Sequence, residues 1–143
     1  MSHPPNPSAV IHDPGDAMKS YARWLFGTAA AFNIAVGLAL LWLRPQLGPL
    51  LGLEPVEGTN LVIGNLAGLL VALLGCVYAL IAADPPRYRP LIVLGAVGKL
   101  LAVVCVVLPW LRGEISASLP ALAGGDVVYA ALFLDYLRRT RRG

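Results

Sequence analysis

Four long apolar stretches constrain this chain more than any other feature of its sequence. They cover residues 22–43, 61–83, 91–111 and 115–137. A helix of about 20 apolar residues, at about 1.5 Å rise per residue, spans a bilayer hydrocarbon core of about 30 Å. The sequence therefore predicts an all-α fold, an integral membrane antiparallel four-helix bundle over residues 21–138.

The composition agrees with a membrane location. Of the 143 residues, 57% are hydrophobic and only 13% are charged, more apolar surface than a soluble core of this size can bury. The net charge of +3 is compatible with nucleic-acid binding, but the basic residues flank the apolar stretches instead of forming one patch. We therefore expect membrane lipid as a partner, and no nucleic acid.

Lysine and arginine positions predict how the spans are oriented, because basic residues in short loops stay in the cytoplasm. One side of the predicted bundle carries only Arg44 and Arg112. The other side carries Lys19, Arg23, Arg87, Arg89, Arg138, Arg139, Arg141 and Arg142. We expect a multi-pass protein of the cell inner (plasma) membrane with both termini cytoplasmic.

The segments outside the spans have distinct compositions. Residues 1–20 are rich in proline and without apolar period, which predicts a flexible cytoplasmic tail, and residues 139–143 form a basic cytoplasmic tail. The first span is too long for a cleaved signal peptide and predicts an uncleaved signal anchor. Residues 45–59 mix leucines with glycine and proline, so we expect them on the membrane surface or, alternatively, as a lid over a cavity.

Small residues recur every four positions in the second span, at Gly64, Gly68, Ala72 and Cys76. Such spacing lets two helix backbones approach closely in lipid. This pattern predicts a helix contact and does not by itself indicate a function.

Polar residues inside the spans are the main candidates for a functional site. Lys99 and Asp126 lie at depths that differ by only about 3 Å in two adjacent antiparallel helices. A lone charge at mid-membrane costs about 2.5 to 3.5 kcal/mol, so the two side chains are expected to pair. Asn33 lies at a similar depth and Tyr129 one turn from Asp126, which predicts a mid-membrane polar cluster of these four residues.

Two interpretations of this cluster stay open. Its ion pair can fix the register of the helices, with Asn33 and Tyr129 completing the hydrogen bonds. Alternatively, Asp126 or Lys99 exchanges a proton or holds a ligand headgroup. Lys99 is also compatible with a Schiff base, although four spans enclose little volume for such a cofactor.

Cofactor and metal chemistry find little support in the sequence. The predicted spans contain no histidine, and the chain has no Cys-x-x-Cys motif. Cys76 and Cys105 lie at different depths, so we expect two core thiols and no disulfide. We accordingly expect no cofactor, no metal site and no catalytic residue set, which makes an enzyme the less favoured class.

A set of short motifs gives the chain a family resemblance. The motifs are Gly75-Cys76-Val77-Tyr78, Asp84-Pro85, Arg89-Pro90-Leu91, Gly98-Lys99, Gly125-Asp126 and Leu132-Phe133. In these the chain resembles uncharacterised small bacterial four-span membrane proteins, and its layout is similar to DoxX-like proteins. The resemblance places Lys99 and Asp126 in one pattern and implies no activity.

Three functional hypotheses follow. The chain is an accessory or assembly subunit of a larger membrane complex, in contact with other membrane protein subunits or with copies of itself. Alternatively, it is a small oligomeric transporter or proton-coupled permease that uses Lys99 and Asp126. In the third hypothesis it is a binding protein or enzyme for a lipophilic molecule, for which an apolar pocket open to lipid would be the sign.

Overall fold

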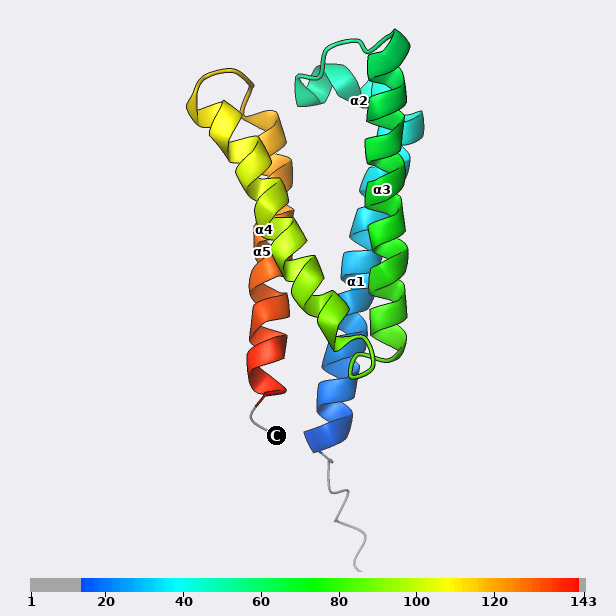
Figure 1. The fold of residues 1–143 in the computed structure, drawn as a ribbon, viewed down its shortest axis with the longest axis vertical. Coiled ribbons are helices and arrows are strands. Elements are labelled where there is room, and N and C mark those ends of the chain that lie inside the picture. Colours follow the sequence, from blue (N-terminus) through cyan, green and yellow to red (C-terminus); the bar gives the residue numbers. More distant parts are fainter. Residues whose placement is uncertain (1–13, 142–143) are drawn as a thin grey trace, which may run out of the picture.

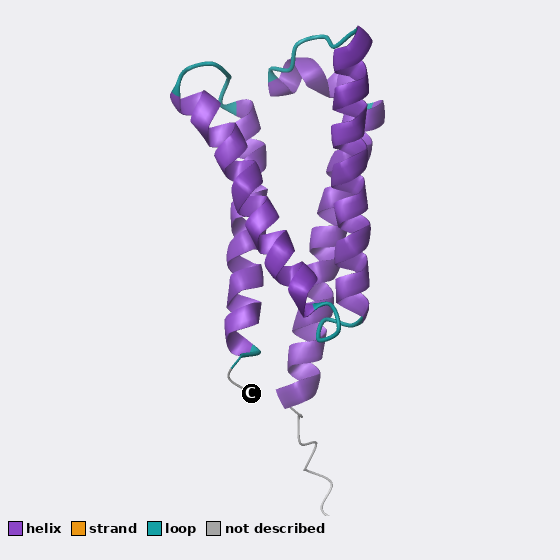
Figure 2. Cartoon of the chain, in the orientation of Figure 1, coloured by secondary structure: helices purple, strands orange, loops and turns teal. Residues whose placement is uncertain are grey.

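A computed structural model describes residues 14–141, which form five α-helices and no strand (Figures 1 and 2). The helices are α1 (Pro14–Trp42), α2 (Arg44–Leu51), α3 (Gly58–Ala83), α4 (Arg89–Leu111) and α5 (Ser118–Arg139). All but α2 are long and apolar enough to cross a membrane. The all-α class and the four predicted spans are confirmed, and the chain is a multi-pass membrane protein.

The helix ends differ from the predicted spans by at most three residues, except at the start of α1, where the difference is eight. Helix α1 begins at Pro14, so residues 14–20 of the predicted tail are helical, and Lys19 there pairs with Asp16 at 3.2 Å. Residues 1–13 lie outside the described part of the chain. Helix α5 begins at Ser118 and not at residue 115, because residues 112–117 form the turn between α4 and α5, in which Gly113 is left-handed (φ 73°).

The four long helices form two antiparallel pairs instead of one evenly packed bundle. Helix α1 packs along α3 and α4 packs along α5, whereas contacts between the two pairs are few. Figure 1 shows that the pairs meet at the end where α1 begins and α5 ends, and diverge toward the end that carries α2. We call these the terminal end and the α2 end.

Small residues hold α1 against α3. A Cβ atom added at Gly37 would overlap the backbone of Gly68 and Ala72, and one at Gly75 would overlap the backbone of Ala30. Close backbone approach of this kind replaces the hydrophobic driving force that is missing between helices in lipid. The predicted role of Gly68 and Ala72 in a helix contact is thus confirmed.

The two cysteines occupy a different environment from the one predicted. Both are free, as expected, but Cys76 and Cys105 are exposed on their helices, so the prediction of core thiols is wrong. A four-residue step advances about 40° beyond one full turn, so Cys76 lies about 120° around α3 from Gly64. Gly75 lies within about 20° of Gly64 and takes the buried position instead.

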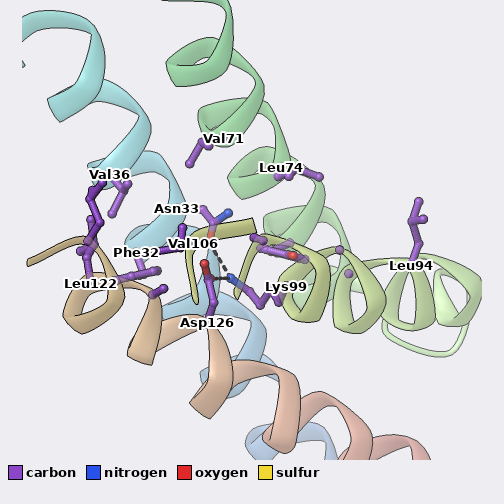
Figure 3. Close-up of a pocket in the computed structure, with 16 residues that line it drawn as sticks. Phe32, Asn33, Val36, Val71, Leu74, Leu94, Lys99, Val106, Leu122 and Asp126 are labelled. Atoms are coloured by element: carbon purple, nitrogen blue, oxygen red, sulfur yellow. Dashed lines mark hydrogen bonds and ion pairs between the residues drawn. The ribbon is translucent and has the colours of Figure 1, made fainter. Parts of the chain in front are cut away.

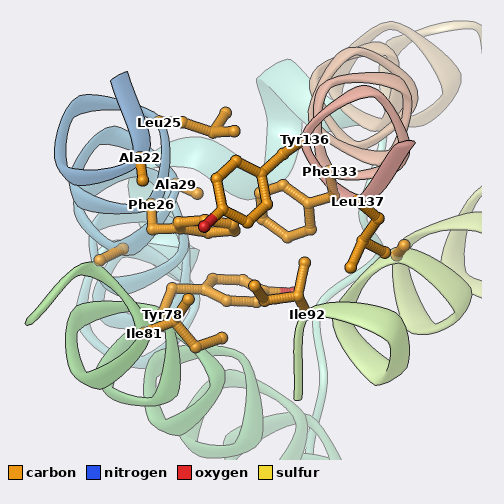
Figure 4. Close-up of a cluster of buried hydrophobic side chains, with 12 residues drawn as sticks. Ala22, Leu25, Phe26, Ala29, Tyr78, Ile81, Ile92, Phe133, Tyr136 and Leu137 are labelled. Carbon is orange, nitrogen blue, oxygen red and sulfur yellow. The ribbon is translucent and has the colours of Figure 1, made fainter. Parts of the chain in front are cut away.

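An aromatic core joins the two helix pairs at the terminal end (Figure 4). The ring of Phe26 from α1 lies 4.9 Å from that of Phe133 and 5.3 Å from that of Tyr136, both on α5. Tyr78 of α3 meets Phe133 edge-on at 5.2 Å. Edge-to-face and tilted pairs at these distances are favourable beyond their packing area, so this end of the molecule is closed.

Helix α2 lies within the segment expected on the membrane surface or as a lid. It begins one residue after α1 and is capped by Gly52, which has a left-handed φ of 67° and donates its N–H to the carbonyls of Gly48 and Pro49. A Cβ at Gly52 would overlap the side chain of Ser116, in the loop before α5. Helix α2 therefore reaches from one helix pair toward the other across the α2 end (Figure 1).

Cysteine labelling tests the predicted orientation. In a background with Cys76→Ala and Cys105→Ala, Thr59→Cys at the α2 end should react with an impermeant maleimide in right-side-out membrane vesicles. Ala17→Cys at the terminal end should react only after the vesicles are opened, because the distribution of basic residues predicts that this end is cytoplasmic. Both positions are exposed. The opposite labelling pattern would overturn the orientation.

Candidate ligand site between the helix pairs

A buried lysine lies where the two helix pairs begin to separate. The side chain of Lys99, on α4, is only 4% exposed. Its Nζ donates a hydrogen bond to Asn33 Oδ1 of α1 at 3.0 Å and lies 2.5 Å from Asp126 Oδ1 of α5 (Figure 3). The structure thus brings together three of the four candidate residues, from three different helices.

The fourth candidate, Tyr129, contributes its ring and not its hydroxyl. The ring centroid lies 5.4 Å from Lys99 Nζ, and the structure gives no hydrogen bond between the two. Phe32 and Tyr78 add two further rings at 5.7 and 5.3 Å. Three aromatic faces around one ammonium group stabilise its charge in apolar surroundings. Neither Phe32 nor Tyr78 is among the site residues predicted from the sequence. The one available signal concerns Phe32, which directly precedes Asn33 in the chain.

The two charges of the ion pair differ in how accessible they are. The side chain of Asp126 is 25% exposed, against 4% for Lys99. Lys99 uses two of its three N–H donors, whereas the ion pair engages only one carboxylate oxygen of Asp126. A polar ligand that approached the ion pair would therefore contact the partly exposed Asp126 first, and the third N–H donor of Lys99 would lie beside it.

A cavity of about 400 Å³ lies next to this cluster. All four long helices line it, with α1 and α3 on one side and α4 and α5 on the other (Figure 3). Its apolar wall includes Val36, Val71, Leu74, Leu94, Val106 and Leu122. Lys99, Asp126 and Asn33 form the charged and amide part of its lining. Small-molecule sites in proteins have this size and this mixture of apolar walls and few polar groups.

Metal binding finds no support in the described part of the chain. Across residues 14–141, no group of three or more His, Cys, Asp or Glu side chains is close enough to hold an ion. Both histidines, His3 and His12, lie outside that range.

Comparisons with known proteins leave the family open. No family model, no curated protein and no solved structure matches the sequence. The resemblance to DoxX-like proteins therefore stays a prediction, and functional conclusions rest on the geometry of the site.

Proposed function

We propose that this protein binds a lipophilic molecule, taken from the surrounding membrane, in the cavity between its helix pairs. The observation that carries this proposal is an apolar cavity of about 400 Å³ with Lys99 and Asp126 in its wall. The wall favours a hydrocarbon body, and the polar cluster favours one hydrogen-bonding group at mid-membrane depth.

The chemistry of the cluster suggests what that polar group is. The spare N–H of Lys99 suits a carbonyl oxygen, and the second oxygen of Asp126 suits a hydroxyl or amide N–H. Because the ion pair has no net charge, a neutral polar group fits it without leaving an unpaired charge in the membrane. A lipophilic carbonyl or alcohol compound is the ligand class that follows.

The other two hypotheses from the sequence stay proposals. Proton-coupled transport would use the same partly exposed Asp126. In that case Asp126→Asn should abolish proton-coupled uptake of the ligand into reconstituted vesicles, while ligand binding persists. An accessory role in a larger complex, as a subunit of a bacterial inner-membrane assembly, would give stable membrane protein partners. Neither role has an observation in its favour beyond those used for ligand binding.

Filling the cavity tests the binding function. Gly98 of α4 lines the cavity, and a Cβ there meets nothing within 4 Å, so Gly98→Phe should place a ring in the space without distorting the helix. Purification in mild detergent followed by mass spectrometry of the organic extract should recover a small molecule from the natural protein. We expect the amount of recovered molecule to fall at least about tenfold in Gly98→Phe, because the phenylalanine ring occupies the space that the ligand needs.

Gly124→Phe provides the matched control. Gly124 is also helical, with nothing within 4 Å of an added Cβ, but it does not line the cavity. This variant should retain the ligand at the natural level. Equal retention in Gly98→Phe and Gly124→Phe, or an empty natural protein, would refute the cavity proposal. Protein partners in the same preparation, with an empty cavity, would favour the accessory role.

A further inference from the structure

Arg44, at the start of α2, has a buried atom whose bonding is incomplete. Its Nη1 is shielded from solvent and has no hydrogen-bond partner, and the described residues offer the side chain no ion pair. Buried polar groups are nearly always hydrogen-bonded, and a guanidinium without a partner in low dielectric is unfavourable. Nη1 itself is covered by the protein, but the side chain as a whole is only half-buried, so an anionic group from outside the protein would bind its accessible part and neutralise the charge.

The neighbouring helix is shaped to hold this guanidinium. A Cβ added at Gly64 of α3 would overlap the guanidinium of Arg44, so the glycine leaves the space in which the group lies. Shape, and not an opposite charge, fixes the side chain there. Its charge is therefore available to a ligand.

Two pockets of different character adjoin Arg44. The first, of about 600 Å³, has Arg44, Asn65, Glu54 and Glu57 in its lining. Both glutamates are exposed, and neither forms an ion pair with Arg44. This pocket therefore offers one cationic group and two anionic groups in the same space. We call it the headgroup pocket.

The second pocket is apolar and leads toward the central cavity. It has a volume of about 380 Å³, and apart from Arg44 its lining is hydrocarbon, including Leu40 of α1 and Leu47 and Leu51 of α2. Val36 and Leu122 line both this pocket and the central cavity, and Figure 3 shows them side by side. The two spaces are thus adjacent, with Val36 and Leu122 between them, so apolar surface extends beneath α2 from Arg44 toward Lys99 and Asp126.

We propose that Arg44 binds the phosphate of a membrane phospholipid whose headgroup also carries a primary ammonium. The guanidinium donates to the phosphate, and Glu54 and Glu57 accept hydrogen bonds from the ammonium group. One acyl chain lies in the apolar pocket beneath α2. This inference rests on the proposed function, since the acyl chain would continue toward the central cavity, while its ester carbonyl would stay beside the phosphate at Arg44.

Charge complementarity favours this lipid over other membrane lipids. An anionic headgroup without an ammonium would satisfy Arg44 but would face both glutamate carboxylates. A quaternary ammonium would supply charge but no N–H donors. A headgroup with a phosphate and a primary ammonium satisfies both parts of the headgroup pocket.

Lipid retention tests this site in the intact protein. The protein is reconstituted in vesicles of equal amounts of phosphatidylcholine, phosphatidylethanolamine and phosphatidylglycerol, extracted in mild detergent and examined by native mass spectrometry. We expect phosphatidylethanolamine to be retained about fivefold over each of the other lipids, and Arg44→Gln to remove this preference. Arg44→Lys keeps the charge without the planar fork and should show a reduced preference.

Arg112→Gln is the matched control, since it removes a basic residue that is 67% exposed and lines neither of the two pockets. It should keep the preference. The double variant Glu54→Gln with Glu57→Gln should raise phosphatidylglycerol to the level of phosphatidylethanolamine. No preference in the natural protein, or an equal loss in Arg112→Gln and Arg44→Gln, would overturn the site.

The outcome also separates this inference from the proposed function. A cavity ligand that is lost in Gly98→Phe but unchanged in Arg44→Gln would sustain the cavity function and refute the headgroup site. Lipid retention that depends on Arg44 but not on Gly98→Phe would sustain the headgroup contact and refute binding in the central cavity.

Discussion

Replacing Lys99 with methionine is expected to destabilise the folded protein by about 2.5 to 3.5 kcal/mol, the cost of a lone charge at mid-membrane. Methionine preserves the length of the side chain but leaves the carboxylate of Asp126 without its counter-ion and Asn33 without its donor. The measurement is the midpoint of denaturation by sodium dodecyl sulfate in mixed micelles. The exposed pair of Lys19 and Asp16 supplies the control.

Lys19→Met should leave that midpoint unchanged, because an exposed ion pair contributes little. Adding Asp126→Leu to Lys99→Met should recover much of the lost stability, with a coupling energy of about 0.5 to 3 kcal/mol. Additive effects of the two single changes would show that the side chains do not interact in the membrane, against the geometry of the ion pair.

The same double variant distinguishes the two roles of the cluster. Recovered stability with the cavity ligand retained would assign Lys99 and Asp126 to holding the helices in register. Recovered stability with the ligand lost would assign them to binding. The second result is the one expected from the proposed function, since both residues line the cavity.

The spans and the charged pair are predictable from the sequence because each depends on one strong constraint. Span length follows from bilayer thickness. Pairing of Lys99 and Asp126 follows from the cost of lone charges at matched depth in adjacent helices. The place of Asn33 in the cluster is predicted from its depth in the membrane alone. None of these inferences needs the lateral arrangement of the helices.

The cavity is not predictable in the same way because it depends on that arrangement. Apolar side chains such as Leu74 and Leu94 give the same sequence pattern whether they face lipid, another helix or a cavity, since their surroundings are apolar in every case. The separation into two pairs and the position of α2 result from packing between segments far apart in sequence. Tyr78 approaches Lys99 only because of this packing.

Leucine at Gly37 is expected to destabilise the protein by about 3 kcal/mol or more, since the added side chain would enter the space of the α3 backbone at Gly68 and Ala72. Helices in lipid are held by close packing, so no hydrophobic gain offsets the forced separation. Gly27→Leu is the control on the same helix, because a Cβ at Gly27 meets nothing within 4 Å. Denaturation midpoints in mixed micelles should fall for Gly37→Leu and stay unchanged for Gly27→Leu. Equal midpoints would mean that α1 and α3 do not pack through Gly37, and the cavity, whose wall depends on that pair, would lose its support.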